Sequence, residues 1–199
     1  MKNFILLRFL LIVLLLCCVS RHAEAQDLKS ILSGVVKTVV GDKATTSTSI
    51  VGTWQYSAPD CCFESDNLLA QAGGEVAAAE VESRLASVYK KIGLDNLRYT
   101  FNEDGTYSYT VKKISSSGTY TFDESAKTIT MTGKLGIKTV AHVTTTGSSM
   151  SLVFDADKLM TVLKTLSGAV SKVNSTASTL NSIIGSYDGL LLGFEMAKQ

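Results

Sequence analysis

The chain has 199 residues, and its 19 Lys and Arg residues nearly balance 18 Asp and Glu residues, which gives a formal net charge of +1. The lysines are scattered rather than clustered, whereas a nucleic-acid partner favours a concentrated basic face. The composition therefore argues against nucleic-acid binding. A single proline and the absence of a Pro/Gly/Ser-rich linker predict one domain, long enough for a sizeable core.

The first 25 residues have the pattern of an export signal. Lys2 and Arg8 precede an apolar run over residues 9–19, and Ala23-Glu24-Ala25 matches an A-x-A cleavage site. The run is about eleven residues long, whereas a helix needs roughly 20 to cross a bilayer. We expect residues 1–25 to be removed and the protein to be periplasmic or secreted, with no transmembrane span in the mature chain.

A lipid anchor is the alternative to cleavage, because Cys17 or Cys18 could become the acylated first residue of a lipoprotein. Such cysteines usually follow a small residue, whereas Cys17 follows Leu16 and Cys18 follows another cysteine. Cleavage after Ala25 is therefore favoured. It removes three cations and one anion and leaves the mature chain with a net charge of −1.

The mature chain begins with a predicted amphipathic helix. Its apolar residues recur at helical spacing, and Gly41 supplies a stop; they are Leu28, Ile31, Leu32, Val35, Val36 and Val39. A Thr/Ser-rich connector follows. We assign residues 26–46 to this helix and connector and residues 47–199 to the main domain.

The first strand of that domain is predicted over residues 50–57, where Trp54 and Tyr56 share one face. Pro59 ends the strand or places it at an edge, because proline cannot donate to a sheet ladder. The adjacent Cys61 and Cys62 are interpreted as small, half-buried residues at the strand's end. A vicinal or intermolecular disulfide is the alternative, and a bond between neighbours would be strained.

Residues 65–92 change to helical spacing and predict one or two helices, split at Gly73 and Gly74 and closed by Gly93. Six alternating segments then predict strands in a meander. They are residues 97–101, 107–111, 120–122, 129–131, 137–145 and 150–154, with turns at 102–105, 115–118, 123–125 and 146–149. Such regular spacing is typical of a sandwich or barrel rather than of βαβ units.

Two more helical segments and a last strand complete the chain. The helices are predicted from Asp155 to Leu166 and over residues 170–184, and the strand over residues 187–197. The total is eight strands, and pairing the first with the last would remove both sheet edges. The predicted fold is mainly β: an eight-stranded antiparallel up-and-down barrel, with helices between strands 1 and 2 and before the last strand.

Several sequence segments resemble the calycin superfamily, whose lipocalins open their barrel with a Gly-x-Trp motif such as Gly52-Thr53-Trp54. A longer series is similar to the lipocalin-like DUF4923 family of exported Bacteroidetes proteins, over roughly residues 47–199. The series comprises Gly52-Thr53-Trp54-Gln55-Tyr56, Pro59, residues 65–70, Gly73-Gly74, residues 101–106, residues 118–120, residues 154–159, residues 187–189 and Gly193-Phe194. The resemblance implies a lipocalin-like barrel.

The chain also departs from typical lipocalins. Their first two strands are joined by an open loop, whereas residues 65–92 are predicted to be helical. Lipocalins carry a basic residue near the last strand that packs over the tryptophan. The predicted strand over residues 187–197 contains none, and Lys198 is the nearest candidate. Ligand binding therefore does not follow from the resemblance alone.

Catalytic and metal-binding patterns find little support in the sequence. His142 is the one histidine of the mature chain, so a triad or a His-based metal site would depend on it alone. Asp155 and Asp157 are interpreted as helix-capping residues rather than calcium ligands. The acidic pairs Glu64/Asp66 and Glu103/Asp104 lie in predicted turns, where acidic residues are common. We expect no enzyme activity, no metal and no cofactor.

One set of side chains predicts a function, because all its members are aromatic residues on the apolar faces of their strands. These are Trp54, Tyr56, Tyr99, Phe101, Tyr107, Tyr109, Tyr120 and Phe122. In a closed barrel they converge inside, either as a filled core or as the wall of a pocket with tyrosine hydroxyls as polar groups. The leading hypothesis is a protein that binds a small hydrophobic or amphipathic ligand in the barrel. The alternative is a filled barrel that acts as a cell-envelope interaction or structural module.

Overall fold

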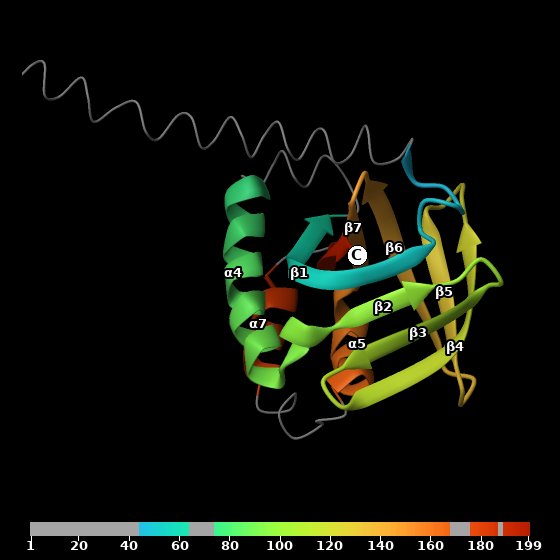
Figure 1. The fold of residues 1–199 in the computed structure, drawn as a ribbon. Helices are drawn as coiled ribbons and strands as arrows, with labels where there is room; N and C mark the ends of the chain where they lie inside the picture. The colour runs from blue at the N-terminus through green and yellow to red at the C-terminus, as the bar shows by residue number, and fades with distance from the viewer. Residues whose placement is uncertain (1–43, 64–73, 168–175, 187–188) are drawn as a thin grey trace, which may run out of the picture. The chain divides into compact units, whose positions relative to one another are not determined.

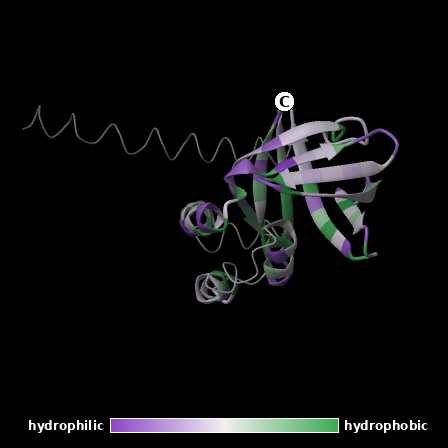
Figure 2. Cartoon of the chain, turned by 60° about the horizontal axis from the view of Figure 1, so that its bottom comes forward, coloured by the Kyte–Doolittle hydropathy of each residue, from purple (hydrophilic) through white to green (hydrophobic). Residues whose placement is uncertain are grey.

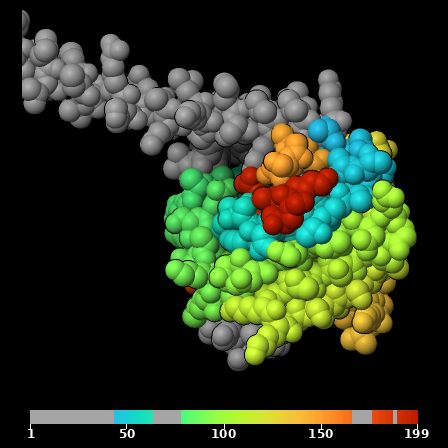
Figure 3. Space-filling model, in the orientation of Figure 1, coloured from blue at the N-terminus to red at the C-terminus, as the bar shows by residue number. Residues whose placement is uncertain are grey.

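Eight antiparallel strands close on themselves, since β1 (Gly52–Phe63) pairs with both β2 (Arg98–Phe101) and β8 (Leu190–Lys198). The computed structural model describes residues 44–63, 74–167, 176–186 and 189–199, all within the compact unit Val39–Gln199. Figure 1 shows the strands in order around the barrel, and Figure 3 shows the C-terminal residues of β8 beside β1. The predicted up-and-down barrel is confirmed.

The remaining strands follow one another as a meander. They are β3 (Thr106–Val111), β4 (Ile114–Asp123), β5 (Thr128–Gly133), β6 (Lys138–Thr146) and β7 (Ser149–Asp155). Helix α4 (Gly74–Ile92) and a short 3-10 helix, η1 (Leu94–Asn96), connect β1 to β2. Helices α5 (Ala156–Ser167) and α7 (Ala177–Ile184) precede β8. Both predicted helical insertions are therefore confirmed.

The predicted end of the first strand near Ser57 is wrong, because β1 continues through Pro59 to Phe63. Beyond Gln55 the strand has no partner on β2 and pairs only with β8, where Pro59 lies opposite Phe194. A proline is tolerated at such a local edge, since it has no N–H to donate. A bulge between Tyr56 and Ala58 shifts the register where β1 leaves β2.

The predicted turn at residues 115–118 is also wrong. These residues belong to β4 and pair with β3, and the turn lies at Lys112 and Lys113. Lys112 adopts φ 54°, a left-handed conformation that is uncommon for a residue with a side chain. The Ser-Ser-Ser-Gly sequence is typical of a turn, but cross-strand pairing overrides that preference.

The expected signal peptide, the N-terminal helix over residues 28–39 and residues 65–73 lie outside the described residues.

The core lies inside the barrel and continues under the helices. Cross-strand partners share a face, so the register places Trp54, Tyr99 and Tyr109 on the same inner side. Inner side chains on β7 and β8, including Leu152 and Phe194, join them in one hydrophobic cluster. Helices α4, α5 and α7 add Leu85, Leu163 and Leu180 to that cluster, and all three are buried. The three helices thus bury their apolar faces in the same core as the barrel.

Candidate functional site

The structure places all eight predicted aromatic residues in or against the barrel core. Trp54 and Phe101 are 0% exposed, and Tyr99, Tyr107 and Tyr109 are buried. Tyr56, Tyr120 and Phe122 are half-buried and pack against the same cluster. A side chain that borders a space large enough for water retains accessible surface. The buried members of the set therefore contact neighbouring atoms, and no water-filled space reaches Trp54 or Phe101.

Five of these rings form one cluster on β2, β3 and β4. Tyr99 is at its centre, with ring centroids 5.7 Å from Phe101, 5.7 Å from Tyr109 and 6.4 Å from Tyr107. Tyr120 packs edge-on against Phe101 at 5.2 Å. These separations are the ones that attractive aromatic pairs adopt. Five of the eight predicted residues are therefore brought together, and their rings contact one another.

Tyr56 belongs to a second aromatic group that the sequence analysis missed in part. Its ring lies 6.3 Å from Tyr89 of α4 and 6.2 Å from Phe194 of β8, and Phe154 packs 6.0 Å from Phe194. Phe154 and Phe194 are in alternating segments and could have been included by the same criterion. Tyr89 carried no such signal, because it lies on a helix next to Val88 and only the fold brings it to the barrel.

Trp54 is held at one end of the barrel by contacts from both chain termini of the domain. Its indole Nε1 donates to the carbonyl of Ile50 at 2.9 Å, and the Lys198 ammonium lies 5.2 Å from the ring centroid. The expectation that the last strand lacks a basic residue over the tryptophan is wrong, because β8 extends to Lys198. Gly52 adopts φ 132°, and a Cβ there would lie 2.9 Å from Lys198 Cε, which explains glycine in the Gly-x-Trp motif.

The opposite end of the barrel, called here the mouth, is closed by helices. The Tyr109 hydroxyl on β3 donates to the carbonyl of Thr165 on α5 at 3.1 Å. The Tyr89 hydroxyl on α4 donates to the carbonyl of Gly193 on β8 at 3.2 Å. Figure 1 shows α5 under the barrel and α4 beside the C-terminal half of β1. Two of the tyrosine hydroxyls that could have bound a ligand therefore bind main-chain carbonyls.

The inner tyrosines remain neutral at physiological pH. Burial raises the pKa of Tyr99 and of Tyr89 well above the ordinary value and also raises the pKa of Tyr107 and Tyr109. Burial, with a smaller contribution from the Asp95 carboxylate, raises the pKa of Tyr56 to about 12. These hydroxyls act as neutral hydrogen-bonding groups and supply no general base.

Two glycines that face each other across β4 and β5 make room for an aromatic ring rather than for a ligand. Gly118 pairs with Gly133. A Cβ on Gly118 would lie 2.9 Å from Tyr107 Cε1, and a Cβ on Gly133 would lie 3.9 Å from the Tyr107 hydroxyl. The Tyr107 side chain therefore lies next to this pair of glycines.

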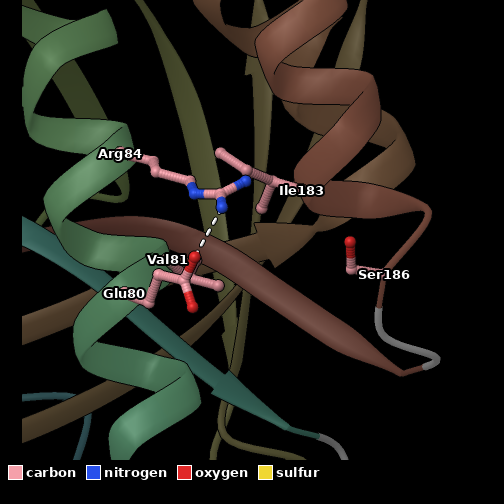
Figure 4. Close-up of a pocket in the computed structure, with 5 residues that line it drawn as sticks. All are labelled: Glu80, Val81, Arg84, Ile183 and Ser186. Atoms are coloured by element: carbon pink, nitrogen blue, oxygen red, sulfur yellow. Dashed lines mark hydrogen bonds and ion pairs between the residues drawn. The ribbon is translucent and has the colours of Figure 1, made fainter.

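A shallow crevice lies between α4 and α7, away from the aromatic set (Figure 4). Its volume is about 160 Å³, and Glu80, Val81, Arg84, Ile183 and Ser186 line it. Glu80 and Arg84 form an ion pair one helical turn apart, and both side chains are about half exposed. Ligand pockets usually measure about 300–1,000 Å³, so this crevice is too small for a drug-sized molecule.

The residues that could carry chemistry are dispersed. His142 lies on the outer face of β6, between Thr128 and Val153. The Asp104 carboxylate accepts bonds from the Thr106 amide and hydroxyl, which lowers the pKa of Asp104 and identifies it as a turn residue. Asp155 and Asp157 are exposed at the junction of β7 and α5. Glu64 and Asp66 lie outside the described residues.

The two cysteines lie in the half of β1 that faces α4. Cys61 is buried and Cys62 is half-buried. Cys61 Sγ lies 3.6 Å from the Ala78 carbonyl oxygen and 4.0 Å from Glu82 Oε1.

Among residues 44–63, 74–167, 176–186 and 189–199, no three His, Cys, Asp or Glu side chains are grouped as metal ligands. Within the same ranges, no helix has the length and apolarity needed to cross a bilayer.

The barrel agrees with the family that the chain matches. A family described as a lipocalin-like domain (DUF4923) matches residues 25–198. A DUF4847 family protein from Bacteroides vulgatus ATCC 8482 is similar at 11% identity and a TM-score of 0.35, over 75% of this chain and 95% of that chain. A protein from Bacteroides uniformis ATCC 8492, solved by NMR, is similar at 18% identity and a TM-score of 0.31, over 56% and 83%. Among curated proteins, none matches.

Proposed function

Since the chain belongs to the lipocalin-like DUF4923 family, we propose that it is a non-enzymatic, exported barrel whose interior is filled and which acts through its outer surface. The burial of the aromatic set carries this proposal. Trp54 and Phe101 have no accessible surface, and five rings of the set contact one another. The barrel then serves as a rigid scaffold in the cell envelope.

The closure of the mouth supports the same conclusion. Helices α4 and α5 each place buried apolar side chains, Leu85 and Leu163 among them, in the core that the barrel shares. Hydrogen bonds tie Tyr89 and Tyr109 to main-chain carbonyls across the mouth. A ligand entering from that side would have to displace these contacts, and the hydrogen-bonding groups left behind would lose their partners.

A titration with a fluorescent fatty acid tests the filled interior. We expect no saturable signal at micromolar concentrations. The wild-type chain and Tyr109→Ala, which removes an inner ring and its hydrogen bond to α5, form the matched pair. Saturable binding by the wild-type chain that Tyr109→Ala weakens would overturn the filled barrel.

The second candidate function is the binding of a small hydrophobic or amphipathic ligand inside the barrel. The observation that favours it is the half-burial of Tyr56, Tyr120 and Phe122, whose rings retain accessible surface beside the core. Native mass spectrometry of protein purified from its own host tests this candidate, because a retained ligand adds mass.

Export is part of the proposal and rests on the charged start, the apolar run and the A-x-A sequence ending at Ala25. We expect the mature protein to begin at Gln26. N-terminal sequencing of the protein from an envelope or culture fraction tests this. A retained N-terminus would contradict cleavage, and an acylated cysteine at position 17 or 18 would establish the lipid anchor instead.

A further inference from the structure

The hairpin turns of β2 to β6 sort their charges by barrel end. At the Trp54 end, the β2–β3 turn carries Glu103 and Asp104, and the β4–β5 turn carries Asp123 and Glu124, with Lys127 as its one cation. At the mouth, the β3–β4 turn is Lys112 and Lys113, and the β5–β6 turn is flanked by Lys134 and Lys138. Alternate turns of an antiparallel meander lie at opposite ends, so this part of the barrel has an acidic end and a basic end.

The basic end also exposes apolar side chains. Within the described residues, the exposed large hydrophobic side chains are Ile114, Leu135, Ile137 and Val140. Leu135 is 88% exposed and Ile137 is 54% exposed, and both lie in the β5–β6 turn. In Figure 2 this hairpin shows hydrophobic and hydrophilic segments next to each other at its tip. Residues 112–114 and 134–138 are called here the basic tips.

The tip that presents Leu135 is an ordered turn. The Gly133 amide donates to the Ile137 carbonyl at 3.0 Å, and the Gly136 amide donates to the Gly133 carbonyl at 2.9 Å. Gly136 adopts φ 74°, which favours glycine, and a Cβ there would meet nothing within 4 Å. Backbone geometry thus holds Leu135 in solvent, where no described side chain covers it.

The two tips lie at the same end of adjoining strands. Gly118 of β4 pairs with Gly133 of β5, and β4 continues past this pair toward Ile114. After Gly133 the chain turns back into β6, whereas β4 extends beyond this pair to the β3–β4 turn at the same end of the barrel. No Asp or Glu occurs over residues 105–122 or 125–154. Lys113, Lys134 and Lys138 consequently have no carboxylate from either hairpin beside them.

We propose that the basic tips bind an anionic lipid surface, with Leu135 and Ile137 in the interface and the flanking lysines at the headgroups. Lysines near apolar side chains can extend their ammonium groups to the lipid headgroups, and each adds attraction to an anionic leaflet. The acidic turns at the opposite end are repelled by the same surface, which orients the barrel with its mouth toward the lipid. A second copy is disfavoured as the occupant, because two sets of tips would bring like charges together.

The acidic groups near the mouth set the limits of this surface. Lys112 extends over Gly93 at the end of α4, where Asp95 is also exposed. Asp155 and Asp157 are exposed where β7 meets α5. The uncompensated positive charge is therefore on the β3–β6 side of the mouth. The proposal rests on the exported, surface-acting barrel proposed above.

Vesicle flotation with the mature chain, which begins at Gln26, tests the lipid surface. We expect binding to vesicles of phosphatidylcholine with phosphatidylglycerol, and little binding to phosphatidylcholine alone. Replacing Lys113, Lys134 and Lys138 by Gln should weaken binding about tenfold or more. The matched control replaces Lys90, Lys158 and Lys164 by Gln, which changes net charge equally and leaves the tips intact.

The apolar part of the surface is tested without any change in charge. Leu135→Ser should weaken binding severalfold, and Val140→Ser, at an exposed position on the strand outside the tips, should not. The Leu135→Trp variant should be quenched by brominated lipid more strongly than Val140→Trp, since Trp54 is buried in both. Equal vesicle binding by the wild-type chain, the tip triple variant and Leu135→Ser would overturn the proposal.

Two other outcomes would also overturn it. If the wild-type protein does not bind anionic vesicles, the basic tips do not form a lipid-binding surface. Self-association that Leu135→Ser abolishes, measured by sedimentation equilibrium, would identify a second copy as the occupant. A fatty-acid signal from the interior would contradict the filled barrel alone and leave vesicle binding unaffected, so the two proposals fail separately.

Discussion

The two ends of this barrel are closed in different ways. At the Trp54 end, residues near both termini of the domain close the barrel. The Trp54 indole donates a hydrogen bond to the Ile50 carbonyl, and Lys198 lies over the indole. At the mouth, helices inserted between strands supply the closure through Tyr89 and through the Thr165 carbonyl. One end thus depends on a short sequence motif and the other on long-range packing. The first is therefore expected to be intolerant of substitution, and the second to be the adaptable end.

The largest effect is expected at Trp54. Trp54→Ala removes a fully buried ring and its hydrogen bond, and large-to-small changes of this kind cost about 3–5 kcal/mol of unfolding free energy. Urea unfolding followed by circular dichroism measures the loss, and Trp54→Phe serves as the milder control. A loss below about 1 kcal/mol would show that this end is not the better packed one.

The paired glycines of the inner face give the next largest effect. A Cβ on Gly118 would lie 2.0 Å from the Thr132 carbonyl oxygen, so Gly118→Ala forces backbone movement and should cost about 1–3 kcal/mol. Its cross-strand partner Gly133 is the matched control, because a Cβ there meets its nearest atom at 3.8 Å. Equal unfolding free energies for the two variants would contradict the geometry of this face.

High pH should destabilise the folded chain through Tyr56. Its pKa is raised to about 12 in the folded chain, whereas an unfolded tyrosine ionises near pH 10. Both states bind the proton below about pH 10, and above it the unfolded state loses its proton first. The unfolding free energy should therefore fall as the pH rises from about 10 toward 12, and less so in Tyr56→Phe. Unfolding midpoints at several alkaline pH values check this, and identical slopes would contradict it.

The smallest effect is expected for Lys198→Met. This change keeps an unbranched side chain over the indole and removes the charge, so it should cost about 0.5–1 kcal/mol, the value of an exposed cation–π contact. The fluorescence of Trp54, the single tryptophan of the chain, reports unfolding directly. An effect as large as that of Trp54→Ala would mean that Lys198 has another role.

The difference between the two ends also explains what the sequence could predict. Alternation predicted the strands around Trp54, Tyr99 and Tyr109, and their shared face follows from pairing alone. The continuation of β1 past Pro59 was missed, because the edge that tolerates proline exists only once β2 has ended. Lys198 was named as the nearest basic residue, but its position depends on how far β8 extends.

The mouth could not be predicted in the same way. Helical spacing indicated α4 and α5, but no local pattern relates Tyr89 to Gly193 or Tyr109 to Thr165. Alternation predicted that the eight aromatic side chains share the apolar face, but it did not predict that Tyr56 packs with Tyr89 and Phe194 in a separate group. The exposure of Leu135 could not be predicted either, because apolar residues occur in buried turns as well as in exposed ones.

Xenon titration with methyl NMR tests the filled interior most directly, because xenon occupies dry apolar cavities. The methyl groups of Ile129, Met150 and Leu152 report from the inner face, and all three residues are buried. We predict no saturable shifts in the wild-type chain, and shifts in Trp54→Ala, where a cavity has been made. Saturable shifts of these methyl groups in the wild-type chain would contradict the account.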